Sequence, residues 1–234
     1  MKRILFILLI IPTLLMGQDR VVQTKIFHNN IVRYRDTFVD ATVGDTHPRE
    51  WVMGTGSYVI DSLVTESGLP YFNVGDKYLQ NTVAGTIATQ STSAYGSWEF
   101  NIYKGADANS LDVLFQSSMI EAIDEGGTGY ELIFRSDERI QFVEINAGAD
   151  IQLSRTSVSY FAINTWYGIK ITRTTVGIFT IYIKGGSFGD AYTLVDVSGG
   201  SGTNPTTDNT YTESQFFVID SDALDKFTNL KITR

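Results

Sequence analysis

The chain contains no cysteine and only two histidines, His28 and His47, among its 234 residues. Without cysteine it has no disulfide bond, no thiol nucleophile and no residue for a lipoprotein anchor. Two histidines are too few for the nitrogen and sulfur ligands that zinc prefers, and neither lies in a recognisable nucleophile motif. Any catalysis by this chain would therefore have to rest on carboxylates or tyrosines.

Glycine-rich phosphate and dinucleotide motifs are also missing, as is the G-x-S-x-G nucleophile elbow. Basic residues are scarce: 18 Lys and Arg stand against 26 Asp and Glu, which gives a formal net charge of −8. An acidic chain repels phosphate backbones and anionic lipid surfaces. Neither nucleic acid nor a membrane surface is therefore an expected partner.

An apolar run lies near the N-terminus. Lys2 and Arg3 precede the apolar residues 4–16, and Gly17 is a small residue suited to a cleavage site. The run is shorter than the roughly 20 residues that span a bilayer, and Pro12 interrupts it. We therefore expect residues 1–17 to be a secretory signal peptide, the protein to be exported, and no membrane insertion after signal removal.

Helical periodicity is lacking in the rest of the chain. Apolar and polar residues alternate instead in short segments rich in Val, Ile, Thr, Tyr and Phe, which favour strands. Long loops rich in turn residues are expected at 29–50 and 198–210. The expected strands lie near 57–60, 77–80, 86–88, 94–104, 111–115, 130–135, 139–145, 165–173, 177–184, 192–197, 215–219 and 227–233.

Alternation gives these strands one apolar side each. Trp98 and Phe100, for example, alternate with Glu99 and Asn101. A sheet with one apolar face must bury that face, so we expect two antiparallel sheets that cover each other in a jelly-roll sandwich. The rings of Trp98 and Phe179 should then lie between the sheets.

The order of short motifs resembles a known superfamily. It begins with G-x-G-x-Y at 54–58 and continues with A-G-T-I-A at 84–88, A-Y-G-S-W-E-F at 94–100, N-T-W-Y-G-I-K-I-T-R at 164–173, F-T-I-Y-I-K-G-G at 179–186, and a final F-F-V-I-D and L-K-I-T. This order is similar to that of the concanavalin A-like lectin/glucanase superfamily, of the laminin G-like kind found in secreted bacterial proteins and phage structural proteins. The likeness covers about residues 49–234, which leaves 18–48 as an N-terminal extension with a first strand. Members of the superfamily bind glycans, cleave them, or hold other proteins together.

Glucanases of this fold carry E-x-D-x-x-E on one strand, where alternation directs three carboxylates into one cleft. The nearest run here is Glu121-Ala122-Ile123-Asp124-Glu125, in which Glu121 and Asp124 would face opposite sides of a strand. This spacing favours a solvated turn. The sequence therefore leans against an enzyme.

Three aspartates, Asp220, Asp222 and Asp225, lie between the last two expected strands. Calcium prefers several oxygen ligands from a flexible loop, and calcium sites recur in laminin G-like domains. The run lacks the Gly and the distal Glu of an EF-hand. A polar turn whose aspartates cap backbone N–H groups is the favoured interpretation, and a Ca²⁺ site is the second.

Outward-facing aromatic and polar residues predict a ligand site. Tyr182 shares a strand face with Lys184, and Tyr103 shares one with Asn101. Sugar rings stack on exposed aromatic rings and bond to the polar groups beside them. Asn101, Tyr103, Tyr182 and Lys184 are therefore the predicted glycan-binding residues, although ordinary cross-strand packing also explains each of them.

Three functions follow from these observations. A secreted, non-catalytic, lectin-like protein that binds a glycan or a cell-surface protein is favoured. The alternative is a structural or adhesive component of a cell surface or phage virion, with oligomerisation. A polysaccharide-active hydrolase is the third.

Overall fold

A computed structural model of the chain describes residues 32–36, 38, 41–46, 50–62, 77–106, 108–120 and 126–234. The expected signal segment 1–17, both histidines and the run 121–125 lie outside the described residues. Residues Val32–Arg234 form one compact unit. Across the described part of the chain, no helix is long and apolar enough to cross a membrane.

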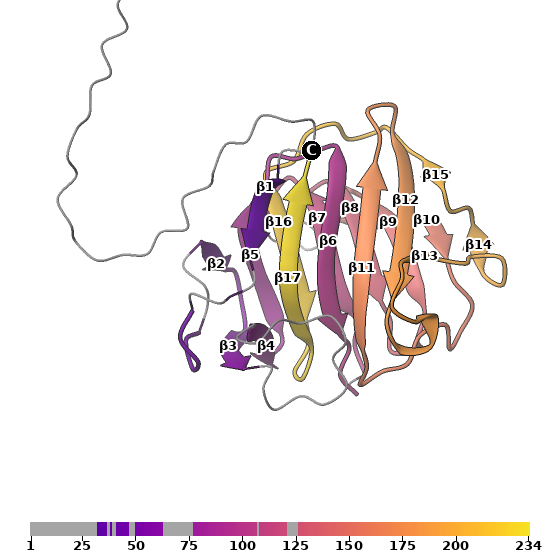
Figure 1. Ribbon diagram of the computed structural model, residues 1–234. Coiled ribbons are helices and arrows are strands. Elements are labelled where there is room, and N and C mark those ends of the chain that lie inside the picture. Colours follow the sequence, from indigo (N-terminus) through magenta and orange to yellow (C-terminus); the bar gives the residue numbers. More distant parts are fainter. Residues whose placement is uncertain are drawn as a thin grey trace, which may run out of the picture. The chain divides into compact units, whose positions relative to one another are not determined.

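Within the described residues, strands form two antiparallel sheets (Figure 1). The front sheet contains β1 (Val32–Asp36), β3 (Ser57–Ser62), β4 (Lys77–Val83), β6 (Gly96–Tyr103), β11 (Trp166–Arg173), β12 (Ile178–Lys184), β13 (Thr193–Leu194), β15 (Thr206–Thr207) and β17 (Lys226–Thr233). Its order is β13-β12-β11-β6-β17-β4-β3, with β1 beside β17 and β15 beside β12. The first and last described strands are thus neighbours.

The back sheet lies behind the front sheet in Figure 1. It contains β2 (Trp51–Met53), β5 (Gly85–Gln90), β7 (Leu111–Ser117), β8 (Gly129–Phe134), β9 (Ile140–Asn146), β10 (Ala149–Arg155), β14 (Ser201–Gly202) and β16 (Phe216–Ser221). Its order is β14-β10-β9-β8-β7-β16-β5-β2. The all-β, two-sheet antiparallel sandwich expected from the sequence is confirmed.

The structure contains short strands where the sequence predicts loops. β14 and β15 lie within the expected loop 198–210. β1 lies within 29–50, where the sequence predicts a loop, but also within 18–48, where it predicts a first strand. β10 was not expected as a strand, and most of its side chains are exposed. Backbone pairing with a neighbouring strand needs no apolar side chain, so such strands leave little periodicity in the sequence.

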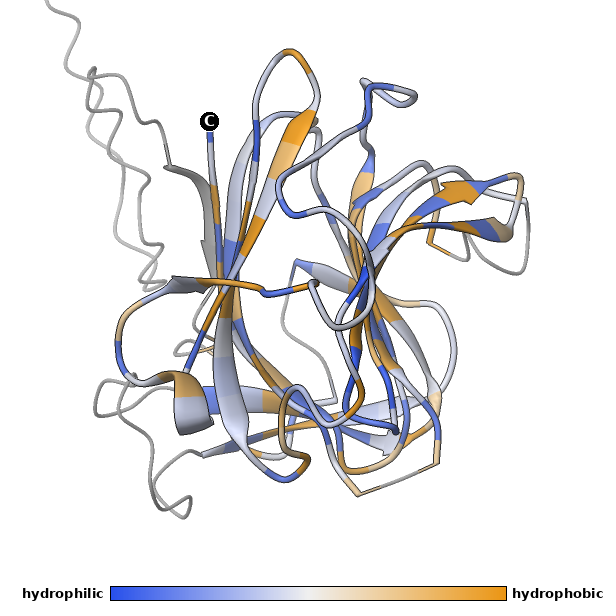
Figure 2. Cartoon of the chain, turned by 90° about the vertical axis from the view of Figure 1, so that its right-hand side faces the viewer, coloured by the Kyte–Doolittle hydropathy of each residue, from blue (hydrophilic) through white to orange (hydrophobic). Residues whose placement is uncertain are grey.

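The core between the sheets is built on aromatic rings, as the alternation predicts. Trp98 is 0% exposed and Phe179 is 1% exposed. Their ring centroids lie 5.2 Å from Phe115 and 5.0 Å from Phe142, both on the opposite sheet. Burying one such ring contributes about 2–3 kcal/mol. In the side view of Figure 2 the two sheets appear as separate layers, with apolar and polar residues alternating along the strands.

A buried arginine closes one end of the core. Arg173, the last residue of β11, has its guanidinium carbon 4.6 Å from the ring centroid of Phe179 and 4.8 Å from that of Tyr130. It donates hydrogen bonds to Gln116 Oε1 at 2.7 Å and to the carbonyl oxygen of Asp208 at 3.3 Å. Burial lowers the pKa of Arg173. The guanidinium therefore ties the front sheet, β7 and the segment before β16 together.

Candidate functional site

The front face, the outer surface of the front sheet, is turned toward the viewer in Figure 1. It consists of the outward side chains of β6, β11, β12 and β17, together with Tyr78 on β4 and Tyr192 just before β13. Strand pairing arranges these side chains in rows across the sheet. In one row, Tyr103 lies between Trp166 on β11 and Lys226 on β17.

An aromatic cluster forms around this row. The ring centroid of Trp166 lies 5.5 Å from that of Tyr103 and 6.0 Å from that of Tyr78. The ammonium of Lys226 lies 4.6 Å from the ring centroid of Tyr103 and 4.8 Å from that of Tyr78. Trp166 is 7% exposed, whereas Tyr103 is half-buried. The cluster therefore presents one accessible ring and one cation held over aromatic faces.

A second row depends on a glycine. Gly168 lies between Asn101 on β6 and Lys184 on β12. A Cβ atom at Gly168 would lie 2.5 Å from Cε of Lys184 and 3.1 Å from Oδ1 of Asn101. The missing side chain thus lets the stem of Lys184 cross β11 toward Asn101.

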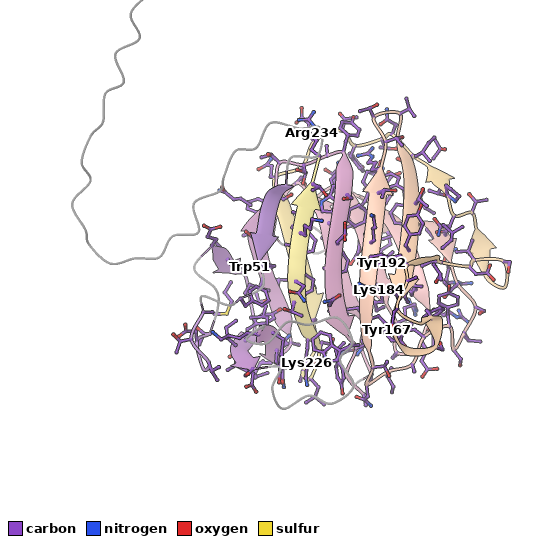
Figure 3. All side chains as sticks on the ribbon, in the orientation of Figure 1. Trp51, Tyr167, Lys184, Tyr192, Lys226 and Arg234 are labelled. Carbon is purple, nitrogen blue, oxygen red and sulfur yellow. The ribbon has the colours of Figure 1, made fainter. Side chains whose placement is uncertain are left out.

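Lys184 and Tyr192 lie next to each other on this face (Figure 3). The Lys184 ammonium lies 4.7 Å from the ring centroid of Tyr192. Burial lowers the pKa of Lys184, while the carboxylates of Glu99 and Asp190 oppose that shift. The ammonium is therefore partly desolvated and held against an aromatic ring.

The third row carries alternating charges. Glu99 Oε1 lies 3.6 Å from Lys170 Nζ and 3.7 Å from Lys231 Nζ, on the two neighbouring strands. Tyr182 pairs with Lys170 from the other side. One carboxylate is therefore shared by two ammonium groups at the middle of the sheet.

All four residues predicted to bind glycan, Asn101, Tyr103, Tyr182 and Lys184, lie on the front face. Asn101 is 6% exposed, more buried than the alternation suggested. Their role in ligand binding stays a prediction. Sequence reasoning missed the neighbouring residues of the site: Trp166, Gly168, Lys170, Tyr192 and Lys226. Trp166, Gly168 and Lys170 alternate with Tyr167 and Ile169 along β11, and this alternation predicts that the three residues lie on the same side of the strand.

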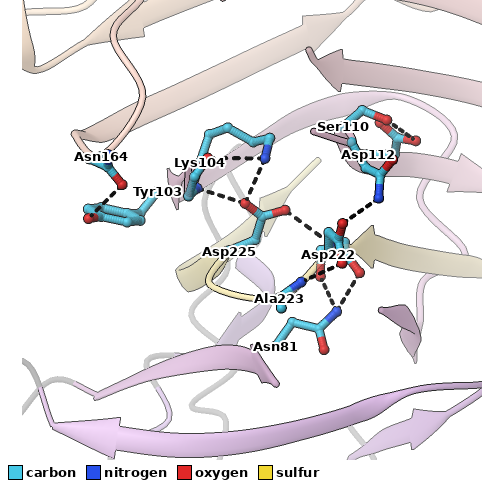
Figure 4. A network of polar contacts seen from close by, with 12 residues as sticks. Asn81, Tyr103, Lys104, Ser110, Asp112, Asn164, Asp222, Ala223 and Asp225 are labelled. Carbon is cyan, nitrogen blue, oxygen red and sulfur yellow. Dashed lines mark hydrogen bonds and ion pairs between the residues drawn. The ribbon is translucent and has the colours of Figure 1, made fainter. Parts of the chain in front are cut away.

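Two of the three aspartates of the expected calcium loop, Asp222 and Asp225, bond to the protein itself (Figure 4). Asp225 is buried, and its Oδ1 lies 3.2 Å from the buried Lys104 Nζ and accepts a hydrogen bond from Gly105 N–H at 2.8 Å. Asp222 Oδ1 accepts from Ala223 N–H at 2.8 Å, and Asp222 N–H donates to Asp225 Oδ2 at 3.1 Å.

The third aspartate, Asp220, lies on β16, opposite Asp112 of β7. No group of three or more His, Cys, Asp or Glu among the described residues could hold a metal ion. Calcium binding by Asp220, Asp222 and Asp225 stays a prediction, and the ion pair of Asp225 with Lys104 speaks against it.

The back face, the outer surface of the back sheet, is buried over β5, β7, β8, β9 and β16, whereas most side chains of β10 are exposed. The expectation that each sheet buries only one side is therefore wrong for this sheet. Several of its strands carry apolar residues on both sides, so the back face has an apolar cluster of its own, with Met119 and Ile120 packed against it. The cluster consists of Ala88, Leu114, Ile133, Val143, Ile145 and Val218.

Carboxyl groups are buried beside this cluster. Glu131 is 0% exposed, and neither of its carboxyl oxygens has a hydrogen-bond partner among the described residues. Burial, followed by the charges of Asp112 and Asp150, raises the pKa of Glu131 well above its usual value. Burial also raises the pKa of Asp112 to about 7, against an opposing hydrogen bond from Ser110.

Raised carboxyl pKa values are typical of glycosidase acids. A substrate cannot reach a carboxyl group that is fully buried, however, so Glu131 does not line a catalytic cleft in this conformation. The carboxyl group of Glu131 is instead part of the packing of the back face.

No family model matches the chain, and no curated protein matches it in sequence. Solved structures of similar fold do exist. Carbohydrate-binding module CBM66 from Bacillus subtilis matches with a TM-score of 0.53 and 16% identity, over 78% of this chain and 95% of that chain. A protein of unknown function from Shewanella oneidensis MR-1 matches with a TM-score of 0.54 and 13% identity, over 90% of this chain and 88% of that chain.

A carbohydrate esterase from the Shiga toxin-encoding bacteriophage phi24B matches with a TM-score of 0.51 and 11% identity, over 88% of this chain and 98% of that chain. At these identities the likeness concerns the fold. It supports the two-sheet β-sandwich fold, while membership of the concanavalin A-like lectin/glucanase superfamily stays a prediction from the motif order.

Proposed function

We propose that the protein is an exported, non-catalytic, glycan-binding β-sandwich that holds a sugar chain across its front face. The observation that carries this proposal is the grouping of half-buried tyrosine rings with lysines and an amide on one sheet face. Tyr103 and Tyr192 offer rings on which a sugar can stack, and the ammonium of Lys184, which lies over the Tyr192 ring, can bond to hydroxyl groups.

The fold supports the same proposal. CBM66, a carbohydrate-binding module, shares the two-sheet architecture over most of its length. The partner would be a polysaccharide, or the glycan of a surface protein, met after export through residues 1–17.

The two alternatives receive less support. A hydrolase needs two accessible carboxyl groups, whereas the strongly shifted Glu131 is buried. An assembly role would be favoured by one large apolar patch. The exposed large apolar side chains among the described residues are instead spread over several strands and turns, among them Val52, Val83, Ile151 and Val176.

A glycan array probed with the full chain tests the proposal. The Tyr103→Ala and Tyr192→Ala variants should each weaken binding about tenfold, because each removes one stacking ring. Tyr211→Ala is the matched control, since Tyr211 is also half-buried but belongs to the segment before β16. Folding of each variant is checked by circular dichroism.

A folded protein that binds no glycan on the array would overturn the proposal. The array is run with calcium and with a chelator. Loss of glycan binding on chelation would support the predicted calcium site at Asp220, Asp222 and Asp225. Unchanged binding would mean that these aspartates have a structural role.

A further inference from the structure

We infer that Asn101 is the residue of the front face that selects the ligand, and that it selects sugars carrying an acetamido group. This inference rests on the proposed function, because it names the class of sugar for the same site. It is carried by an unpaired amide that is recessed in the sheet face and by the groups that surround this amide.

The amide of Asn101 is buried without a partner. Asn101 lies on β6 and is 6% exposed, and its side chain forms no hydrogen bond with any residue in the described part of the chain. Its amide oxygen and nitrogen still keep contact with solvent. Buried polar groups in native proteins are normally hydrogen-bonded, because leaving them unpaired costs stability. An amide that the protein leaves unpaired is therefore able to bond to a ligand.

The groups around this amide limit what can reach it. On one side, Gly168 of β11 has no side chain, and the position of its missing Cβ is 3.1 Å from Asn101 Oδ1. The same position is 2.9 Å from Cγ and 2.5 Å from Cε of Lys184, so methylene groups of this lysine lie beside the amide. On the other side, Asn101 pairs with the fully buried Thr228 of β17. A ligand group that reaches the amide must therefore be narrow and must stand out from the sugar ring.

An acetamido group meets both requirements. A hydroxyl group stands one bond out from the sugar ring, whereas the carbonyl oxygen of an acetamido group stands three bonds out and can reach a recessed donor. This oxygen accepts a hydrogen bond from Asn101 Nδ2, while Asn101 Oδ1 accepts one from a hydroxyl group of the same sugar. The acetyl methyl group then packs against the methylene groups of Lys184.

A ring for stacking lies close to the amide. Tyr103 is two residues from Asn101 on the same side of β6, which places the two residues about 6.6 Å apart along the strand. One sugar with its substituent can span this distance. A sugar that stacks on the half-buried Tyr103 ring can therefore place its acetamido group over Asn101. The ring would hold the sugar, and the amide would distinguish an acetamido group from a hydroxyl group.

Sugar pairs that differ in the acetamido group test the inference. Tri-N-acetylchitotriose is compared with cellotriose, and N-acetylgalactosamine with galactose, by isothermal titration calorimetry on the full chain. We expect at least one acetamido sugar to bind about tenfold more tightly than its hydroxyl counterpart. The pair that shows the difference distinguishes the gluco from the galacto configuration.

Saturation-transfer NMR on the native protein shows which part of the sugar is in contact. The acetyl methyl protons should receive the strongest saturation, because the methyl group packs against Lys184. A bound sugar whose methyl group receives less saturation than its ring protons would overturn the inference.

The Asn101→Leu variant assigns the selectivity to the amide. Leucine has nearly the same shape but neither donor nor acceptor, so the preference for the acetamido sugar should disappear. Because the protein makes no hydrogen bond to this amide, the midpoint of thermal unfolding should stay the same or rise. Asn146→Leu is the matched control, since Asn146 is exposed at the end of β9, and it should leave the preference unchanged. A midpoint that falls further in Asn101→Leu than in Asn146→Leu would indicate a structural role and overturn the inference.

The outcomes separate the inference from the proposed function. Equal affinity for acetamido and hydroxyl sugars, or a preference that survives in Asn101→Leu, would overturn the inference but leave glycan binding intact. Binding on the array to glycans without acetamido groups alone would do the same. A folded protein that binds no glycan at all would overturn both.

Discussion

The front face carries half-buried lysines and tyrosines, whereas the back face carries buried aliphatic side chains and carboxyl groups. Both faces arise from the same alternation along strands. On the front face, Glu99 is 24% exposed and lies between two ammonium groups. On the back face, Glu131 is fully buried among apolar residues and has no hydrogen-bond partner within the described residues.

The difference shows what keeps a charge on a sheet. A carboxylate stays ionised where water or a cation solvates it, and it takes up a proton where neither does. The front face has retained its charges, among them Glu99, Lys170 and Lys231. On the back face, burial favours the neutral form of the carboxyl groups. We therefore expect this face to make the stability of the protein depend on pH, and not to bind a ligand.

The largest expected change in the free energy of unfolding comes from replacing an isoleucine by alanine on the back face, compared with the same replacement on the front face. Ile145→Ala on the back face should lower the free energy of unfolding by about 3 kcal/mol, as in a core, because Ile145 is fully buried. Ile178→Ala on the front face should cost less than about 1 kcal/mol, because Ile178 is 37% exposed. Urea unfolding of both variants measures the contrast, and equal losses would mean that the two faces are equally covered.

The next effect is a loss of stability as the pH rises. Burial raises the pKa of Asp112 from its ordinary 3.8 to about 7 and raises that of Glu131 as well. The folded state therefore keeps protons that the unfolded state has released, so stability is highest near pH 4 and falls as the pH approaches 7. For one such proton the decrease between pH 5 and pH 7 is about 2 kcal/mol.

Urea unfolding at pH 5 and pH 8 measures this loss. Glu131→Gln should flatten the pH profile, because the amide is neutral at both values. Glu213→Gln, at an exposed position before β16, should leave the profile unchanged. A native protein that becomes more stable between pH 5 and pH 7 would contradict the assignment of protonated carboxyl groups to the back face.

Much of the front face could be predicted from the sequence, because alternation is a local property. It placed Trp98 and Phe179 in the core, and it placed Asn101 and Tyr103 together on an outward side. It could not place Lys226 beside Tyr103, since the two residues are far apart in the chain and meet only when β17 pairs with β6. Such lateral neighbours depend on sheet order, which strand periodicity does not encode.

The burial of the back face was harder to foresee. In β8, Tyr130 and Leu132 point to the core while Glu131 and Ile133 point outward. A glutamate in that position normally indicates a solvated side, so the sequence predicts that β8 buries only the side of Tyr130 and Leu132. The outward residues of β9 and β16 are apolar, which indicates instead that the back sheet is covered on both sides.

The smallest expected effect on stability, and the sharpest test of the front face, is Gly168→Ala. The new Cβ would lie 2.5 Å from Cε and 2.9 Å from Cγ of Lys184, so the whole lysine side chain has to move away from β11. The cost of this movement opposes the gain from replacing a glycine within a strand, so the free energy of unfolding should change by less than about 1 kcal/mol. Glycan affinity should nevertheless fall several-fold, because Lys184 is displaced from its place between Asn101 and Tyr192. Gly199→Ala, beside Ser157 and outside the front face, should leave affinity unchanged. If Gly168→Ala binds glycan as tightly as the native protein, Lys184 does not contact the ligand. Glycan recognition would then have to rest on the aromatic cluster around Trp166.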